Sequence, residues 1–360
     1  MKFLDLFAGI GGFRFGMESV GHECIGFCEI DKFARESYKS IFQTKGEIEL
    51  HDITAVSDEF IRGIGRVDII CGGFPCQAFS IAGNRRGFED TRGTLFFEIA
   101  RFASILRPKY LFLENVKGLL NHENGITFET IISTLDELGY NVEWESINSK
   151  NFGVPQNRER VFIIGHLRGE RTRRIFPLGG ENQSTSSQSV VKIGNVNPSG
   201  NGMNGEVYQA DGLAPTLTTN KGERQKIAIK SNTIKQFGIL QPNFNQCGVV
   251  YETDGIAPTI RAYQGGGLEP KIIQRGHGYN QGGVHEIAPT LTSNSYHENN
   301  HLSFGYRIRK LTPRECWRLQ GFPDWAFDKA QEVNSNSQLY KQAGNSVTIN
   351  VIAAIAKELE

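Results

Sequence analysis

The feature that most constrains the fold is an alternation of short apolar runs with helical patterns through the first 170 residues. Five of these runs are predicted to be strands: Lys2–Phe7, Glu23–Glu29, Val67–Cys71, Tyr110–Glu114 and Val161–His166. Regular alternation of strands and helices is typical of a parallel, doubly wound sheet, because each connecting helix covers one face of the sheet. We therefore predict an α/β domain with a mostly parallel sheet over residues 1–175.

The segment 127–138 carries a clear helical pattern, with five apolar side chains on one face. We expect Thr127 to cap the start of this helix and Gly139 to end it. Two further helices are predicted near the C-terminus, at Thr312–Gln320 and Thr348–Leu359.

Composition changes near residue 175, where the chain becomes rich in Gly, Asn, Ser and Thr. Three segments of this part share Ala-Pro-Thr followed by an apolar residue, with their threonines at Thr216, Thr259 and Thr290. The spacings of 43 and 31 residues are too irregular for a solenoid. We predict a smaller, loop-rich β domain over residues 176–305, and a return segment, 306–360, that completes the first domain.

The charge distribution and the cysteines indicate which partners and which cellular compartment to expect. Residues 1–150 carry 16 basic and 22 acidic side chains, whereas residues 151–360 carry 23 basic and 17 acidic ones. The net charge of the whole chain is zero, but the second part is basic, which is compatible with DNA binding by that part. An ordinary solvated surface explains the charges equally well. No apolar run approaches the roughly 18 residues of a membrane span, and the six scattered cysteines fit a reducing compartment, so we expect a cytoplasmic protein.

A glycine-rich turn follows the first predicted strand, in DLFAGIGGFRFG. Gly9, Gly11 and Gly12 remove side chains where a ligand would approach the backbone at a helix N-terminus. Glu29 ends the second strand 20 residues after Gly9, where a carboxylate can accept hydrogen bonds from two ribose hydroxyls. Arg14 occupies the place of the third glycine of the dinucleotide fingerprint, which disfavours a nicotinamide dehydrogenase.

A candidate nucleophile and a candidate acid follow two other strands. Cys76 lies in GFPCQAFS beyond the strand that ends at Cys71, and Glu114 ends the strand that begins at Tyr110. The carboxyl ends of parallel strands meet at one edge of the sheet, so the thiol and the carboxylate should lie close together. This pair suits attack on an electron-poor ring, in which the thiolate adds to one carbon and the acid steadies a ring nitrogen. A buried structural cysteine and a helix-capping carboxylate are the plainer alternatives.

Seven motifs, in one order, carry a resemblance to a known family: DLFAGIGG, GFPCQAFS, RGTLFFEI, FLENV, FGVPQNRERVFIIG, RKLTPRECWRLQGFP and QAGNSVTINV. In these motifs the chain resembles the DNA (cytosine-5-)-methyltransferases of bacterial or phage restriction-modification systems, over nearly all of residues 1–170 and 305–355. The resemblance implies a Rossmann-like methyltransferase domain and a target-recognition domain over residues 176–305. It also implies methyl transfer from S-adenosyl-L-methionine to carbon 5 of a cytosine flipped out of duplex DNA.

The resemblance assigns roles to single residues. Cys76 would be the nucleophile that adds to carbon 6, Glu114 would contact the cytosine, Arg160 would hold the cytosine oxygen or its phosphate, and Arg158 would orient the active-site groups. The residues expected to bind the cofactor are Phe7, Gly9, Gly11, Glu29, Asp52, Ile53, Pro75, Leu95, Asn345 and Val347. Residues 341–360 should pack back onto the first domain beside Phe7 and Gly9.

Two segments are expected to contact DNA. The stretch between Gln77 and Thr94 resembles a lid that closes on DNA, and its candidate contacts are Ser80, Arg85, Arg86 and Arg92. In the family, a threonine followed by an apolar residue helps to accept the flipped base, and Thr259 and Thr290 compete for that role. We expect Thr216 only to pack a β core.

The expected partner is duplex DNA, with a cognate restriction endonuclease as a functional rather than necessarily a physical counterpart, and the protein is expected to be a monomer without membrane contact. The alternatives are an RNA cytosine-5 methyltransferase and a non-catalytic DNA-binding regulator. The His297-Glu-Asn-Asn-His301 sequence matches a zinc hydrolase motif, but its polar, turn-rich context does not predict the helix that such a site needs, so no metal is expected.

Overall fold

The computed structural model describes residues 1–75, 95–178, 190–195, 206–210, 212–217 and 311–359, together with short strands between residues 226 and 310. The chain forms two compact units. The first comprises Met1–Val190, Gly212–Gly222 and Thr312–Glu360, and the second comprises Val191–Asp211 and Glu223–Leu311. Residues 212–222, which include the first Ala-Pro-Thr copy, thus cluster with the first unit, although the sequence placed them in the second domain.

A seven-stranded sheet, in the order β3-β2-β1-β4-β5-β7-β6, forms the centre of the first unit. Its strands are β1 (Lys2–Leu6), β2 (Glu23–Cys28), β3 (Ile48–Leu50), β4 (Ile69–Gly73), β5 (Tyr110–Val116), β6 (Tyr140–Asn148) and β7 (Glu159–Leu167). The first five strands in this order are parallel, whereas β7 runs antiparallel to both β5 and β6. The predicted doubly wound, mostly parallel sheet is confirmed.

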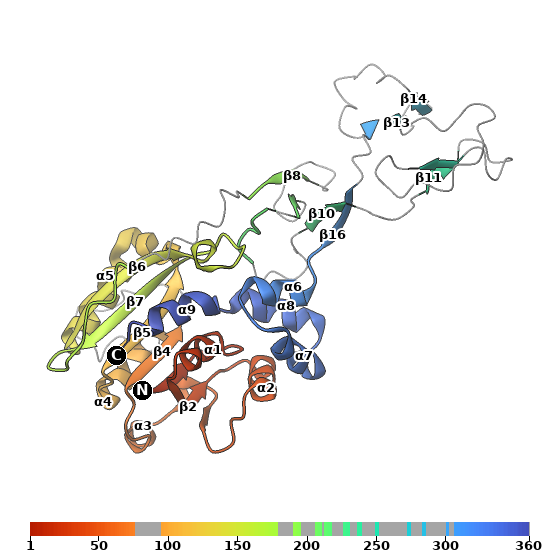
Figure 1. Cartoon of the computed structure of the whole chain (residues 1–360). Coiled ribbons are helices and arrows are strands. Elements are labelled where there is room, and N and C mark those ends of the chain that lie inside the picture. The colour runs from red at the N-terminus through yellow and green to blue at the C-terminus, as the bar shows by residue number, and fades with distance from the viewer. Residues whose placement is uncertain are drawn as a thin grey trace. The chain divides into compact units, whose positions relative to one another are not determined.

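Helices cover both faces of this sheet (Figure 1). The helices of the first unit are α1 (Gly12–Ser19), α2 (Lys32–Ile41), α3 (Asp58–Gly63), α4 (Leu95–Leu106), α5 (Ile126–Glu137), α6 (Pro313–Leu319), α7 (Asp324–Val333), α8 (Asn336–Asn345) and α9 (Ile349–Ala356). Of these, α1 and α9 pack on one face and α3, α4 and α5 on the other, whereas α6, α7 and α8 pack against one another and against α2. Short 3₁₀ segments lie at η1 (Ile53–Ala55), η3 (Lys117–Gly125) and η4 (Ser149–Phe152).

Alternation along the strands divides the core into two layers. On one face, Phe3, Ile69 and Phe112 pack with apolar residues of α1 and α9. On the other face, Leu4 and Ile70 pack with residues of α4 and α5. Because both faces are buried, the strands are almost continuously apolar, which explains why they were recognisable in the sequence.

The C-terminal helix α9 packs directly on α1, as the sequence predicted. A Cβ atom on Gly16 of α1 would lie 2.6 Å from the side chain of Ile352, so this glycine allows the two helices to approach closely. Val347, Val351 and Ile352 are buried, as is Ile355, whereas Ile349 is only partly buried. The part of the core formed by β1 and α1 is thus completed by residues more than 300 positions further along the chain.

The described part of the second unit is built of short strands. A four-stranded sheet has the order β16-β10-β9-β8, formed by β8 (Lys192–Asn195), β9 (Glu206–Gln209), β10 (Lys226–Lys230) and β16 (Tyr306–Lys310). Two smaller sheets pair β11 (Gln236–Ile239) with β12 (Val249–Tyr251), and β13 (Ile272–Gln274) with β14 (Gly283–His285) and β15 (Asn300–His301). His301 of the zinc-like sequence is therefore in a strand, not on a helix.

Candidate active site

A pocket of about 650 Å³ opens at the carboxyl edge of the sheet. Its wall includes residues from the ends of β1, β2, β4 and β5, and residues of α8 and of the segment before β7. Open α/β sheets bind their ligands at this edge. The pocket brings together most of the cofactor residues predicted from the sequence: Phe7, Gly9, Glu29, Asp52, Ile53, Pro75, Leu95 and Asn345.

The glycine-rich turn after β1 exposes backbone to the pocket. Phe7 and Gly9 both have left-handed backbone angles, with φ values of 57° and 56°. A Cβ atom on Gly9 would meet nothing within 4 Å, so the backbone here faces open space that a ligand can enter. Gly11 differs, because a Cβ atom there would lie 2.3 Å from the ring of Phe42. The structure thus gives Gly11 a packing role, and neither Gly11 nor Val347 is among the described residues that line the pocket.

Glu29 is held in place by two backbone N–H groups, one on the turn after β1 and one at the start of α2. One carboxylate oxygen accepts a hydrogen bond from the N–H of Gly9 at 2.8 Å, and the other accepts one from the N–H of Asp31 at 2.8 Å. Burial raises the pKa of Glu29, and these two N–H groups oppose that rise. A carboxylate oxygen has further lone pairs, so the side chain can still accept hydrogen bonds from a ligand.

Asp52 and Ile53 form the next part of the wall. Asp52 caps η1, where its Oδ1 accepts hydrogen bonds from the backbone N–H and the hydroxyl of Thr54. These bonds lower the pKa of Asp52, which keeps the carboxylate ionised. Ile53 is buried and contributes an apolar surface beside this carboxylate.

The carboxylate predicted to act on the substrate lies at the end of β5. Glu114 pairs in register with Gly73 of β4, so it lies beside the strand end that leads to Cys76. Its Oε1 lies 3.0 Å from Nε of Arg160, and both side chains are largely buried. Burial raises the pKa of Glu114, while the guanidinium groups of Arg160 and Arg158 act in the opposite direction. A buried carboxyl with a raised pKa can hold or share a proton at neutral pH.

Asn115 fixes the backbone just after β4. Its side-chain amide donates a hydrogen bond to the carbonyl of Phe74 at 2.9 Å, and its own oxygen accepts one from the N–H of Val116. Asn115 lines the pocket, but both polar atoms of its side chain are used in these bonds, which indicates a structural role. It positions the residue that lies two places before Cys76.

Two further charged residues of the pocket wall were missed from the sequence. Nζ of Lys341 on α8 lies 2.6 Å from Oδ2 of Asp31, and this ion pair joins α8 to the start of α2. The hydrogen bond from Lys341 lowers the pKa of Asp31 despite partial burial. The pair links positions about 310 residues apart, so no local pattern could have indicated it.

Comparison with known proteins identifies the family. The family model described as "C-5 cytosine-specific DNA methylase" matches residues 1–360. The chain is a member of the C-5 cytosine-specific DNA methylase family. It is 34% identical to "Orphan methyltransferase M.SPRI" of Bacillus phage SPR, over 100% of this chain and 97% of that protein. It is 37% identical to "Type II methyltransferase M.HhaI" of Haemophilus parahaemolyticus, over 99% of this chain and 93% of that protein.

Solved structures agree on the fold. The crystal structure of the S. pombe Dnmt2 methyltransferase superposes with a TM-score of 0.60 at 16% identity, covering 99% of this chain and 97% of that one. The protein is thus a DNA (cytosine-5-)-methyltransferase, as its motifs predicted.

Along the described stretches of the chain, no helix is long and apolar enough to cross a bilayer.

In this methyltransferase the first Ala-Pro-Thr copy forms part of the pocket wall. The segment is tied to the strand-like stretch before β7, since Ala214 and residues 155–157 exchange two backbone hydrogen bonds of 2.8 Å. Thr216 also donates its hydroxyl to the carbonyl of Asn157 at 2.7 Å, and both Thr216 and Leu217 line the pocket. This position differs from the expectation that Thr216 only packs a β core.

Several predicted residues of the methyltransferase lie outside the described residues. They are Cys76, Ser80, Arg85, Arg86, Arg92, Thr259 and Thr290. Their roles remain predictions from the resemblance.

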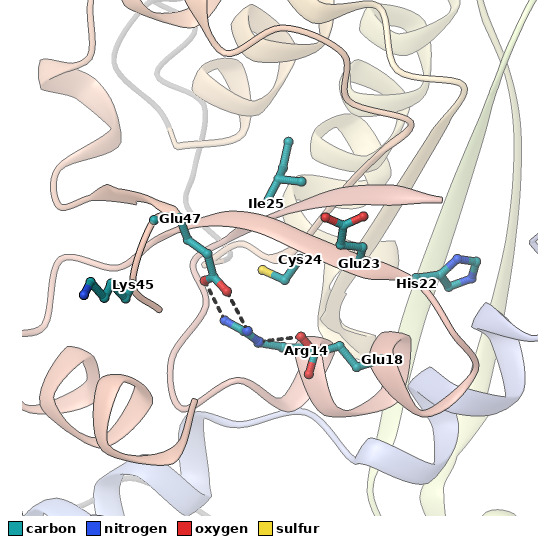
Figure 2. A pocket seen from close by; sticks show the side chains of 9 residues that line it. Arg14, Glu18, His22, Glu23, Cys24, Ile25, Lys45 and Glu47 are labelled. Carbon is teal, nitrogen blue, oxygen red and sulfur yellow. Dashed lines mark hydrogen bonds and ion pairs between the residues drawn. The ribbon is translucent and has the colours of Figure 1, made fainter. Parts of the chain in front are cut away.

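Arg14, which replaces the third glycine of the dinucleotide fingerprint, has a structural role in this methyltransferase. Its guanidinium makes two hydrogen bonds of 2.8 Å to Glu47 and one of 2.8 Å to Glu18 (Figure 2). It also lies over the ring of Phe42. Arg14, Glu18 and Glu47 line a second, open cavity of about 530 Å³. The carboxylates satisfy the guanidinium, so it ties the loop before β3 to α1.

Proposed function

We propose that this methyltransferase takes its methyl group from S-adenosyl-L-methionine and places it on carbon 5 of a cytosine flipped out of duplex DNA, through a covalent bond between Cys76 and carbon 6. The observation that carries the proposal is the buried Glu114–Arg160 pair in the pocket that also contains Gly9 and Glu29. The same pocket therefore contains a surface suited to a nucleoside cofactor, at Gly9 and Glu29, and a carboxylic acid, Glu114, paired with the guanidinium of Arg160.

The part of the pocket formed by Gly9, Glu29 and Asp52 has hydrogen-bonding groups that fit the nucleoside of S-adenosylmethionine. Glu29 presents a fixed carboxylate to two ribose hydroxyls, and Asp52 can accept a hydrogen bond from an adenine amino group. The exposed backbone at Gly9 leaves room for the amino-acid part of the molecule. When bound, S-adenosylmethionine supplies an electrophilic methyl group.

The other part of the pocket suits the ring chemistry. The Cys76 thiolate bonds to carbon 6, and Glu114 provides a hydrogen bond or proton at ring nitrogen 3, where negative charge develops. Carbon 5 then has the electron density to accept the methyl group, whose bond to the sulfonium sulfur would break and leave S-adenosylhomocysteine. Loss of the carbon 5 proton to solvent expels the Cys76 sulfur as thiolate, and ring nitrogen 3 returns any proton it has taken to Glu114, so the aromatic ring and both side chains are restored. Arg160, whose Nε lies 3.0 Å from Oε1 of Glu114, would hold the carbonyl oxygen of the cytosine or its phosphate.

A flipped base is required because carbons 5 and 6 cannot be reached inside the base stack. The pocket volume of about 650 Å³ is of the size that holds a drug-sized ligand, which is enough for a nucleoside cofactor with a single extruded base beside it. The second unit, with its short strands, is proposed as the target-recognition domain. The relatives named as type II and orphan methyltransferases suggest a role in protecting DNA from restriction.

The experiment offers the purified protein tritiated S-adenosylmethionine with duplex DNA and, in parallel, with transfer RNA. We expect label only in DNA, with 5-methylcytosine at a defined sequence in the methylome of a host that expresses this single gene. Label in transfer RNA alone would favour the RNA methyltransferase alternative. Absence of transfer to either substrate, with DNA binding retained, would favour the non-catalytic regulator.

A further inference from the structure

Arg158, immediately before β7, is a nearly fully buried cation whose side chain contacts two distant parts of the chain. Its side chain is 2% exposed. One terminal nitrogen donates to the carbonyl oxygens of Ser346 at 2.7 Å and Gly344 at 3.2 Å, and the other lies 3.5 Å from the carbonyl oxygen of Leu217. Its partners are therefore backbone atoms that come from positions 59 to 188 residues away.

The bonding of Arg158 is incomplete within the described part of the chain. No carboxylate there forms an ion pair with it, and its Nε is buried without a hydrogen-bond partner. Burial, together with the charge of Arg160, lowers the pKa of Arg158. A buried guanidinium with an unsatisfied donor is costly, so its presence in the pocket wall indicates a role other than stability.

On one side, Arg158 reaches the part of the pocket that we assign to the cofactor. Gly344 lines the pocket at the end of α8, and α8 is tied to α2 by the Lys341–Asp31 ion pair. The N–H of Asp31 in turn holds Glu29, the proposed ribose ligand. A continuous set of contacts thus leads from the cofactor carboxylate to Arg158.

On the other side, Arg158 reaches the part that we assign to the target base. Leu217 lines the pocket next to Thr216, and Arg158 acts electrostatically on Glu114. The guanidinium is planar, with its donors in a fixed geometry, so the carbonyls of Leu217 and of the Gly344–Ser346 turn cannot move independently without losing a hydrogen bond.

We propose that Arg158 is a positioning residue that couples the binding of the cofactor to the binding of the target cytosine. This inference rests on the proposed function. Coupling of this kind is reciprocal, so each ligand should strengthen the other's binding by the same factor, and typical factors are about 5- to 150-fold. The role is distinct from contact with either ligand, because it depends on both sites together.

The test measures four dissociation constants. S-adenosylhomocysteine, which supports no turnover, is titrated into the protein alone and into the protein with saturating cognate duplex, and the duplex is titrated in the same two ways. For the unaltered protein we expect a coupling factor of at least about fivefold. Arg158→Lys keeps the positive charge but loses the planar guanidinium, whose donors reach two carbonyl groups at once. For this variant we expect a coupling factor within about twofold of one, with binding of each single ligand retained.

A matched control is Arg168→Lys, at the opposite end of β7. This guanidinium also donates to backbone carbonyls, those of Asp136 at 3.1 Å and Tyr140 at 3.4 Å, but it does not line the pocket. Its coupling factor should equal that of the unaltered protein. If Arg158→Lys fails to fold by its melting curve, Lys341→Ala, which frees α8 from Asp31, should reduce the coupling factor instead.

The inference is overturned if the unaltered protein shows no coupling, or if the variant that folds retains the full factor. Both ligands binding without coupling would remove this inference alone. Failure of S-adenosylhomocysteine or of the duplex to bind at all would remove the proposed function as well.

Discussion

Nε of Arg160 lies 3.0 Å from Oε1 of Glu114, and both side chains are withdrawn from solvent at the carboxyl edge of the sheet. This arrangement places an acid with a raised pKa and a fixed cation beside the strand end that leads to Cys76. A carboxylate that only capped a helix would need neither the burial nor the cation.

The acid role of Glu114 predicts a large effect of Glu114→Gln. We expect the rate of methyl transfer in single turnover to fall by about 10²- to 10⁴-fold, because glutamine cannot supply a proton at the ring nitrogen. Binding of S-adenosylhomocysteine should be unchanged. Glu159→Gln, in the neighbouring exposed ion pair with Lys117, is the control and should keep the normal rate. A Glu114→Gln rate within threefold of normal would contradict the role.

The two backbone donors on Glu29 predict the behaviour of Glu29→Gln. The amide replaces one oxygen by an NH₂ group, which cannot accept from Gly9 or Asp31, and the ribose contact loses its charge. We expect S-adenosylmethionine to bind at least about tenfold more weakly by calorimetry, since a hydrogen bond to a charged group contributes about 1.5–3 kcal/mol. Glu23→Gln, an exposed change at the start of β2, should leave the affinity unaltered. Equal affinities for the two variants would show that Glu29 has no part in cofactor binding.

Asp5, buried under the glycine-rich turn, predicts a dependence of stability on pH. Burial raises the pKa of Asp5 from its ordinary 3.8 to about 8, against the opposing charge of Arg14. Between these two pH values the folded protein binds a proton that the unfolded chain lacks, so the free energy of unfolding falls as pH rises. From pH 6 to pH 8 this group should remove ~2 kcal/mol of stability.

The isosteric variant Asp5→Asn isolates this contribution. Asparagine can still accept the hydrogen bond from Tyr38, but it does not titrate. The free energy of unfolding of both proteins is measured with urea at pH 6, 7 and 8. As pH rises from 6 to 8, the unaltered protein should lose ~2 kcal/mol relative to the variant. Parallel pH profiles for the two proteins would mean that Asp5 does not gain a proton on folding.

Thr216 in the pocket wall predicts an effect on catalysis. Thr216→Val removes the hydroxyl that donates to Asn157 and keeps the shape of the side chain. Loss of this hydrogen bond, of about 1 kcal/mol, should let Thr216 and Leu217 shift in the pocket part assigned to the target base. We therefore expect kcat/KM for methyl transfer to fall by roughly five- to tenfold. Thr130→Val on α5, whose hydroxyl also donates to a backbone carbonyl, is the matched control. Normal kinetics for both variants would return Thr216 to the packing role expected from the sequence.

Much of the fold could be predicted because its central strands are buried on both faces. All five predicted strands, now β1, β2, β4, β5 and β7, were located to within two residues at each end, and the carboxyl edge followed from their direction. The edge strands β3 and β6 were missed. β3 has only three residues, and β6 mixes exposed polar residues with Trp144, as edge strands do.

The remaining errors concern contacts between distant positions and the conformation of single residues. Thr127 was expected to cap α5, but Gly125, with φ of 91°, takes that place and Thr127 is buried inside the helix. The three Ala-Pro-Thr copies are alike locally, and only the pairing with residues 155–157 brings Thr216 to the pocket. Likewise, Arg158 was predicted from its motif, whereas its carbonyl partners depend on the folded chain.

The central claim is that Cys76 forms a covalent bond to the cytosine ring, and adduct trapping tests it most directly. Duplex DNA with 5-fluorocytosine at the target position cannot lose the carbon 5 substituent as a proton, so the adduct should accumulate. With S-adenosylmethionine present, we expect the unaltered protein to form a complex with this DNA that resists denaturation. Cys76→Ser should form none and transfer no methyl group, although it still binds S-adenosylmethionine. A trapped complex or near-normal turnover with Cys76→Ser would contradict the account.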